Sequence, residues 1–285
     1  MINEPQPAGW QASLHLGFAK RGERTTLYRR EHRGPLRVQR AFYPEACGVC
    51  HVILLHPPGG VVGGDRLQLH VQVDANAHAL VTTPGASKLY RSAGPVADST
   101  QNLNVAAGGC FEWLPQETIA FAGARAHLAT RVQLAADARF IGWEITCLGR
   151  PASGERFERG ELSQRIELWR SERPLFVERA LYRGGGAALV APWGLAGQPV
   201  VGTFLCAVPE LQQLALGDLA RSALAGSQAA AASDRVSVSC MGEVLVARYL
   251  GPSTERARAC FTQLWQLLRS QLVGQPAITP RIWLT

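Results

Sequence analysis

Residues 67–73 read L-Q-L-H-V-Q-V, with apolar residues at the odd positions and polar residues at the even ones. Successive side chains of a β-strand point to opposite faces, so this stretch predicts a strand with one buried face and one polar face. The same two-residue period recurs further along the chain. It places on shared faces Leu128, Thr130, Val132 and Leu134, then Leu162, Gln164, Ile166 and Leu168, and then Val236, Val238 and Cys240. Strands should therefore dominate both halves of the chain, and we assign it to the all-β class.

Two segments break this pattern and predict helices. Near the end of the chain, Ser253 is placed as an N-cap, Glu255 in a first helical turn and Gly274 as a stop signal. The apolar residues between them have helical spacing; they are Ala257, Phe261, Leu264, Trp265, Leu268 and Leu272. We expect one helix at about 253–273, and a weaker pattern after Pro209 predicts another at about 210–225.

The composition is that of one folded domain. Hydrophobic residues make up 47% of the 285 positions, which is ample for a packed core, and 29 glycines and 17 prolines interrupt short apolar stretches. Neither a repeat, a linker nor a change in composition marks a boundary. A single domain over 1–285 is expected, with a β-rich body at about 10–205.

The chain is expected to be cytoplasmic and to have no membrane partner. Its apolar runs fall short of the roughly 18 to 20 residues that a membrane-spanning helix needs, and residues 1–9 show no export signal. The seven cysteines are an odd number, spread from Cys47 to Cys260. They indicate reduced, buried thiols rather than a disulfide framework.

The formal charge of +7 is carried by 27 arginines and only two lysines, which together make the 29 basic residues. Arginine is favoured at interfaces because its planar guanidinium forms paired hydrogen bonds and stacks on aromatic rings. The densest basic stretch, 20–40, is interrupted by Glu23 and Glu31 and has an alternating strand pattern. Nucleic-acid binding needs a more concentrated basic surface. We favour a solvated or partner-facing strand edge and expect no nucleic-acid partner.

Residues 47–51 match the C-x-x-C-H pattern of c-type haem attachment. An apolar run follows at 52–55 and an export signal is lacking, so small buried thiols at the start of a strand explain Cys47 and Cys50 better. His51 and His56 have an odd separation along this predicted strand. Their side chains should point to opposite faces and cannot easily share a metal ion.

The stretch 59–65, G-G-V-V-G-G-D, resembles a phosphate-binding loop only in its glycine content. Such a loop precedes a helix and usually carries a lysine, whereas a predicted strand follows here. The chain also lacks a nucleophile elbow, an H-E-x-x-H motif and a paired-cysteine metal motif. Isolated carboxylates such as Asp65, Glu144 and Glu178 could act as general bases, although such acids in a β protein are more often turn, cap or ion-pair residues.

A series of short segments stands out between residues 10 and 205. The segments are G-P-L-R-V-Q-R at 34–40, Y-P-E at 43–45, C-H-V-I-L-L-H-P-P-G-G-V-V-G-G-D at 50–65, T-T-P-G-A-S-K-L-Y-R at 82–91, E-W-L-P-Q-E-T-I-A-F at 112–121, G-W-E at 142–144, G-R-P-A-S-G-E at 149–155, P-L at 174–175, E-R at 178–179 and G-T at 202–203. Each is unspecific by itself, whereas the ordered set is highly specific. It resembles the signature of the UreD (UreH) family of urease accessory proteins.

This resemblance implies a β-helix-like, solenoid-like domain with two helices that is not an enzyme. It implies a complex with UreF and the GTPase UreG that docks on apo-urease and assists nickel insertion. The resemblance implies no tightly bound cofactor. It does imply that Ni²⁺ passes through the protein along an internal passage. Matching by motif gives Asp65, Glu144 and Glu178 as acidic residues of that passage. Carboxylate oxygens are acceptable Ni²⁺ ligands, and a conduit must release what it binds.

The chain departs from the family pattern in two places. It has F-A-G-A at 121–124, with Ala122 where the family usually has aspartate, and Cys47 resembles an extra thiol. Two other classes stay open from the residues alone: an all-β hydrolase or lyase with a carboxylate site, and a β-solenoid interaction module unrelated to metals. A maturation scaffold should co-purify with its partners, whereas a hydrolase or lyase should turn over a substrate without them.

Overall fold

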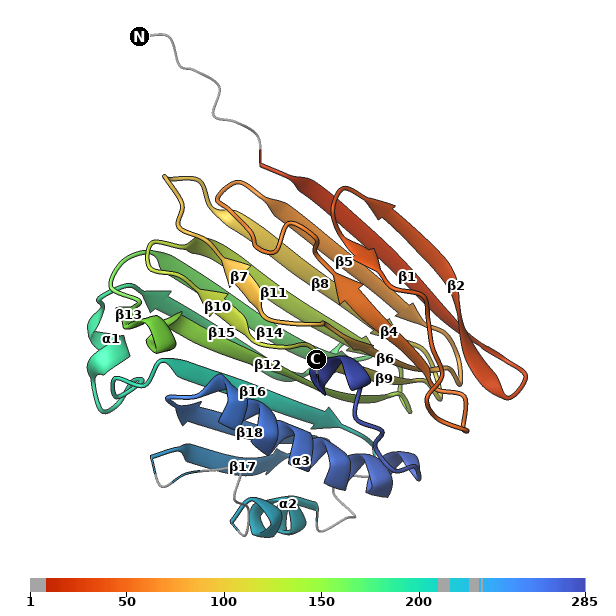
Figure 1. The fold of residues 1–285 in the computed structure, drawn as a ribbon. Coiled ribbons are helices and arrows are strands. Elements are labelled where there is room, and N and C mark those ends of the chain that lie inside the picture. The colour runs from red at the N-terminus through yellow and green to blue at the C-terminus, as the bar shows by residue number, and fades with distance from the viewer. Residues whose placement is uncertain (1–8, 210–215, 226–230, 232, 285) are drawn as a thin grey trace.

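Strands dominate the computed structural model, which describes residues 9–209, 216–225, 231 and 233–284. They account for 51% of it and wind into a β-solenoid of about four turns, with three helices (Figure 1). The all-β, solenoid-like fold predicted from the sequence is confirmed.

The first sheet has seven strands. In spatial order they are β15 (Arg173–Arg183), β14 (Glu161–Arg170), β11 (Arg125–Leu134), β8 (Ala97–Val105), β5 (Arg66–Val73), β1 (Gln11–Arg21) and β2 (Arg24–Arg33). The run from β14 to β1 is parallel, because each turn of the solenoid brings the chain back in the same direction. The strands β15 and β2 close the two ends in antiparallel pairs.

The second sheet faces the first. Its main path is β17 (Arg235–Met241), β18 (Val244–Gly251), β16 (Val200–Ala207), β12 (Arg139–Arg150), β9 (Cys110–Leu114), β6 (His78–Thr82), β4 (Cys50–Leu55) and β3 (Arg37–Val38). Three short strands branch from it: β7 (Ser87–Leu89), β10 (Thr118–Ala120) and β13 (Glu155–Arg156). The strands from β4 to β12 are parallel and belong to the solenoid turns, whereas β16, β18 and β17 extend the sheet in antiparallel order.

Stacked aliphatic side chains build the core between the two sheets. Leu16, Val71, Leu103, Val132 and Leu168 are neighbours on successive strands of the first sheet. All are at most 2% exposed. In-register stacking thus buries one face of each strand, as the alternation at 67–73 predicted.

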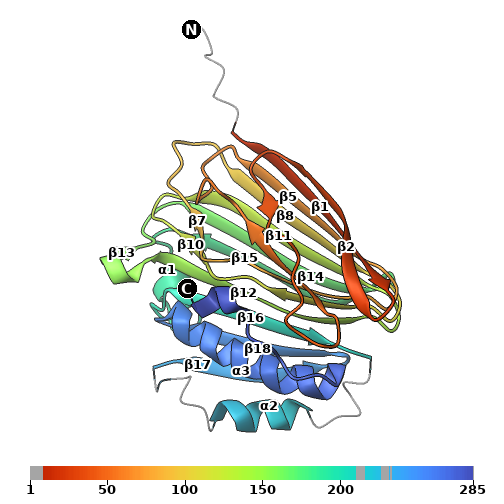
Figure 2. The ribbon, with the colours of Figure 1, turned by 45° about the vertical axis from the view of Figure 1, so that its right-hand side comes forward.

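Three helices follow the solenoid turns. α1 (Ala187–Val190) is a single turn that the sequence pattern did not predict. α3 (Thr254–Val273) lies on the outer face of the second sheet, and α2 (Leu216–Ala225) packs on α3 and β17 (Figure 2). Two short 3₁₀ helices, η1 (Pro151–Ser153) and η3 (Arg281–Leu284), are the other helical elements among the described residues. None of the described helices is both long enough and apolar enough to cross a bilayer.

The predicted C-terminal helix is confirmed with its caps. The Ser253 hydroxyl accepts a hydrogen bond from the Arg256 amide at 3.2 Å, and Gly274 adopts the left-handed conformation with φ 69°. The predicted apolar face is buried, except that the side chain of Leu272 lies outside the described part of the chain. The other predicted helix is confirmed over α2, and residues 210–215 lie outside the described residues.

A buried charged cluster attaches α3 to the second sheet. Arg269 is fully buried; its Nη2 donates to the two Glu45 oxygens at 2.9 and 2.7 Å, and its Nε donates to both Glu112 oxygens at 3.0 Å. His51 Nε2 lies 2.6 Å from Glu45, and His78 Nε2 lies 2.6 Å from Glu112. Burial alone would raise the pKa of both carboxyls, but the histidines and Arg269 outweigh it and lower both pKa values.

Two of the seven cysteines contradict the expectation that all are buried. All seven are free thiols, but Cys240 is exposed and Cys47 is only half-buried. Cys240 is exposed because β17 is the terminal strand of its sheet, which leaves one side of the strand without a neighbouring strand.

Candidate functional site

Polar side chains interrupt the core at inward-facing positions of the first sheet. Gln101 on β8 and Thr130 on β11 are register neighbours, and Gln164 on β14 lies on the same inner face. The aliphatic row described above occupies the following inward position on β8 and β11, and on β14 Ile166 separates Gln164 from that row. Apolar residues would be expected throughout such a face, so these polar residues mark a candidate site.

Glu144 on β12 meets these residues from the second sheet. The Thr130 hydroxyl hydrogen-bonds to Glu144 Oε1, and Gln164 Nε2 donates to Glu144 Oε2 at 2.8 Å. Burial raises the pKa of the Glu144 carboxyl, and the charge of Glu178 raises it further against the opposing effect of the two hydrogen bonds. The Glu144 carboxyl is therefore held by neutral donors and has no basic partner among the described residues.

A second acidic residue lies beside it at the end of the first sheet. Thr203 and Arg248 follow Glu144 across β12, β16 and β18 in register. The Thr203 hydroxyl donates to Glu178 Oε1 at 3.0 Å, and Arg248 forms an ion pair with Glu178 Oε2. Thr203 is therefore a neighbour of both acids: it is the register partner of Glu144 and a hydrogen-bond donor to Glu178.

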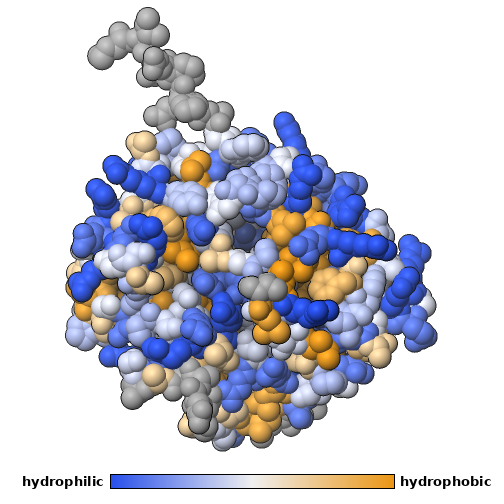
Figure 3. All heavy atoms as spheres, in the orientation of Figure 1, coloured by the Kyte–Doolittle hydropathy of each residue, from blue (hydrophilic) through white to orange (hydrophobic). Residues whose placement is uncertain are grey.

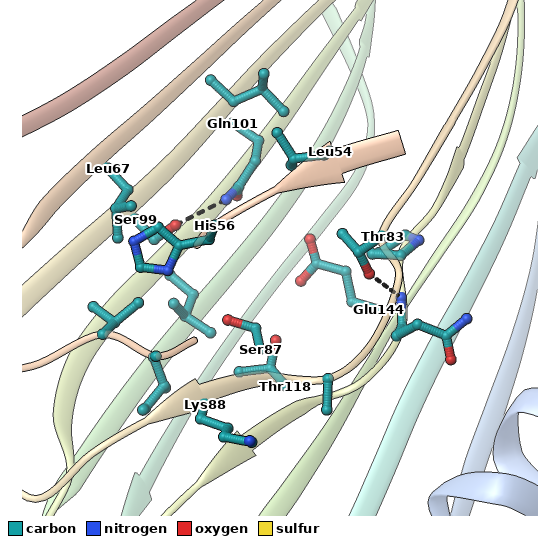
Figure 4. Close-up of a pocket in the computed structure, with 18 of the residues that line it drawn as sticks. Leu54, His56, Leu67, Thr83, Ser87, Lys88, Ser99, Gln101, Thr118 and Glu144 are labelled. Atoms are coloured by element: carbon teal, nitrogen blue, oxygen red, sulfur yellow. Dashed lines mark hydrogen bonds between the residues drawn. The ribbon is translucent and has the colours of Figure 1, made fainter. Parts of the chain in front are cut away.

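Two cavities meet at Glu144 and Gln164, which line both. The first has a volume of about 330 Å³ and extends between the sheets to His56 (Figure 4). The second has a volume of about 560 Å³ and is lined by Glu178 and Arg248. The surface is hollowed near the middle of the face shown in Figure 3. Glu144 and Gln164 thus lie between a cavity that contains His56 and a cavity that contains Glu178. We call this series of polar side chains, from His56 past Glu144 to Glu178, the polar route.

His56 supplies a nitrogen at the other end of this route. Burial lowers the pKa of its imidazole, against the opposing charge of Asp65. The lowered pKa favours the neutral ring, whose unprotonated nitrogen can bind a cation. His51 is buried on the opposite side of β4 in the cluster with Glu45, in agreement with the opposite faces predicted for the two histidines.

Asp65 occupies a different position from the other two predicted acids. It is 2% exposed, and its carboxylate accepts the Trp10 amide at 2.8 Å and the Val62 amide at 2.9 Å. It does not line either cavity. This geometry is that of a turn cap that joins the glycine-rich loop to the entry of β1.

The sequence named Glu144 and Glu178 but not the residues that hold them. Thr130 and Gln164 could have been found, since each interrupts an otherwise apolar alternation. Arg248 offered no such signal, because its acidic partner lies on a strand far away in the chain.

The site offers oxygen and imidazole ligands that are spread along a route. Within the described ranges, His, Cys, Asp and Glu side chains do not gather in any group of three or more that could hold a metal ion. Carboxylate, amide and hydroxyl oxygens suit weak contacts with a divalent cation. The arrangement can therefore offer successive weak contacts but not a closed coordination cage.

These features define the class of protein: a β-solenoid with polar side chains between its two sheets and a helix on the outer face of the second sheet. A family model described as UreD urease accessory protein matches residues 11–284. The chain is 48% identical over 287 residues to "Urease accessory protein UreD" of Dechloromonas aromatica, covering 100% of this chain and 98% of that protein. It is 49% identical over 284 residues to the protein of the same name from Azoarcus sp., covering 100% and 97%. The chain belongs to the UreD urease accessory protein family, which supports a role in urease maturation.

Proposed function

We propose that this protein is a urease maturation scaffold that binds apo-urease together with UreF-like and UreG-like partners. Its relatives carry the name urease accessory protein. In this proposal the chain itself does not hydrolyse GTP, since the glycine-rich loop at 59–65 leads into the strand β5 rather than a helix. The protein acts in the cytoplasm by holding its partners in place.

The proposal includes an internal passage for Ni²⁺ on its way to urease. One observation supports it: Glu144 and Gln164 line both cavities, so they lie between the cavity that contains His56 and the cavity that contains Glu178. Each carboxylate on this route already accepts hydrogen bonds from the protein. A cation must compete with these contacts and is held weakly, which suits transit rather than storage.

The two acids have different tasks in this passage. Among the described residues, Glu144 is the only acid that lines both cavities, and Glu178 lies beside Arg248 in the second cavity. Because burial raises the pKa of Glu144, protons compete with Ni²⁺ there, and nickel transfer should decline as the pH falls. Asp65 is assigned a structural task at the entry of β1.

The enzymatic alternative rests on the same residue. A buried carboxyl with a raised pKa could serve as a general acid in a hydrolase or lyase. Thr130 and Gln164 hold this carboxyl by hydrogen bonds, and the family is one of accessory proteins, so we propose that the chain is not an enzyme. Turnover of a small molecule by the purified chain without partners would contradict this proposal.

The passage can be tested by co-expressing the chain with urease and the other urease accessory proteins of its organism. Glu144→Gln and Glu178→Gln remove one charge each from the route. Glu161→Gln is the matched control: Glu161 lies on β14, its side chain is 42% exposed and it pairs with Arg183 outside the cavities. Purified complexes and urease are then analysed by size-exclusion chromatography and metal analysis.

We expect all three variants to assemble, and both cavity variants to deliver several-fold less nickel to urease than the control. Nickel loading that is unchanged in both cavity variants would show that these acids do not line a passage. Loss of assembly in the cavity variants alone would show that the two acids are structural.

A further inference from the structure

A broad groove opens where the first sheet and the second sheet end. It has a volume of about 1360 Å³ and lies between the terminal strand β2 and the segment 39–43 that precedes β4, with η3 at its side. Its apolar floor consists of Leu27, Phe42 and Ile53. Figure 3 shows hydrophobic surface bordered by strongly hydrophilic side chains to the right of the central hollow.

Four arginines from separate parts of the chain line this groove. Arg24 and Arg30 lie on β2, Arg40 precedes β4 and Arg281 begins η3. Arg24 stacks on the Tyr43 ring at 5.2 Å. None of the four forms an ion pair with a carboxylate of the described residues, whereas their neighbour Arg29 is neutralised by Glu31 at 2.7 Å. The described residues therefore leave the positive charge of the groove uncompensated above an apolar floor.

The strand β2 also has a free edge along this groove. It pairs only with β1, and Figures 1 and 2 both show it at the border of the first sheet. Outside that pairing, the Thr25 amide bonds to the Gly48 carbonyl at 2.9 Å, and the Leu27 backbone is hydrogen-bonded to the Cys50 thiol. The other described residues of β2 form no backbone–backbone hydrogen bond outside the pairing with β1. Residues 28–33 thus present backbone donors and acceptors to an incoming strand over roughly 20 Å, at about 3.3 Å per residue.

We propose that this groove binds an extended acidic segment of a partner protein, which adds to β2 as a further strand. The segment's backbone pairs with the free edge of β2, its apolar side chains enter the floor at Leu27 and Phe42, and its carboxylates pair with the four arginines. Alternating side chains of a strand provide both contacts at once. This inference deepens the proposed function and rests on it, since it identifies the surface that receives one of the scaffold's protein partners.

Two simpler explanations account for less of the geometry. Charged residues on an edge strand hinder unwanted sheet pairing, which would explain Arg24 and Arg30 but not Arg40 and Arg281, which come from other elements. A nucleic acid would also seek positive charge. However, the free strand edge and the apolar floor suit a polypeptide backbone and its apolar side chains.

The test uses the full chain co-expressed with urease and the other urease accessory proteins of its organism. Arg30→Glu/Arg40→Glu reverses two charges in the groove. Arg156→Glu/Arg159→Glu is the matched control, because both residues are exposed, lie outside the groove and undergo the same change in charge. The affinity of each variant for the partner that co-purifies with wild type is measured over a range of salt concentrations. Backbone hydrogen exchange of residues 24–33 is compared between the free chain and the complex.

We expect the groove variant to bind that partner at least about tenfold more weakly than the control, with a reduced dependence on salt. We also expect slower exchange in β2 when the partner is bound. Equal affinity of the two variants, or unchanged exchange in β2, would overturn the inference while leaving the proposed function intact. The inference would also be overturned if the wild-type chain bound a single-stranded oligonucleotide and the Arg30→Glu/Arg40→Glu variant did not. If wild type retains no partner and urease stays inactive, both proposals fail.

Discussion

Replacing Arg269 with methionine removes the positive charge that joins α3 to the second sheet. Methionine is apolar, unbranched and able to fill irregular space, so it occupies much of the same volume in a site where Arg269 is fully buried. Glu45 and Glu112 then each keep one histidine neighbour, at 2.6 Å in both cases. The substitution therefore tests the charge of Arg269 rather than its size.

The expected loss of stability follows from the burial of the cluster. Removing one partner of a buried ion pair costs about 3–5 kcal/mol, because the remaining charge is left without compensation. Arg269 serves two carboxylates, with closest distances of 2.7 and 3.0 Å, so we expect about 4–5 kcal/mol. This is a large share of the roughly 5–15 kcal/mol that stabilises a typical folded protein.

The loss should depend on pH, with a defined sign. The pKa values of Glu45 and Glu112 are lowered in the folded protein, so their stabilising contribution is present above the ordinary carboxyl range and is lost as the pH falls through the lowered values. Without Arg269 these carboxyls accept protons more readily. The difference between wild type and variant should therefore be larger at about pH 8 than at about pH 5.

Urea unfolding followed by far-ultraviolet circular dichroism measures both effects. Arg258→Gln provides the control on the same helix: its side chain is 29% exposed and bonds to Gln116 at 2.5 Å and Glu117 at 3.1 Å. This partly exposed pair should contribute no more than about 1 kcal/mol. If Arg269→Met costs no more than Arg258→Gln, or if its loss is independent of pH, the reasoning about a buried charged cluster is refuted.

Two further predictions concern single residues. Each carboxylate oxygen of Asp65 accepts one backbone amide, and Asp65→Asn replaces one of these oxygens by an NH₂ group that cannot accept. The free energy of unfolding, measured by urea titration, should fall by about 1–3 kcal/mol. Nickel delivery per folded molecule should not change, and a selective loss of delivery would show that Asp65 belongs to the passage. Cys240 should react first with a thiol reagent in the native protein, whereas Cys260, whose pKa burial raises to about 11, should react only on unfolding; equal rates measured by mass spectrometry would contradict this.

Much of the fold was predictable because it depends on local patterns. The period-two alternation at 67–73 predicted the half-buried strand β5, and Ser253 and Gly274 predicted both ends of α3. These features depend on residues a few positions apart, whose side-chain directions follow directly from strand and helix geometry. The ordered motifs also indicated the family that the family model and the relatives then showed.

The candidate site was only partly predictable. Glu144 and Glu178 were named from family motifs. That they lie close together, on different sheets, depends on the register of β12, β16 and β18. Asp65 was named with them, and the structure places it with backbone amides instead. Nothing near Asp65 in the sequence distinguishes an acid that caps a loop from one that lines a cavity.

The sequence by itself determined the class of fold, the C-terminal helix and the family. Only the tertiary structure decided which acids share a cavity, that Arg269 joins two carboxylates beneath α3, and that Arg24, Arg30, Arg40 and Arg281 surround one groove. The physical reason is range: periodicity and capping act over a few residues, whereas the environment of a charged side chain is set by strands that the solenoid brings together from distant parts of the chain.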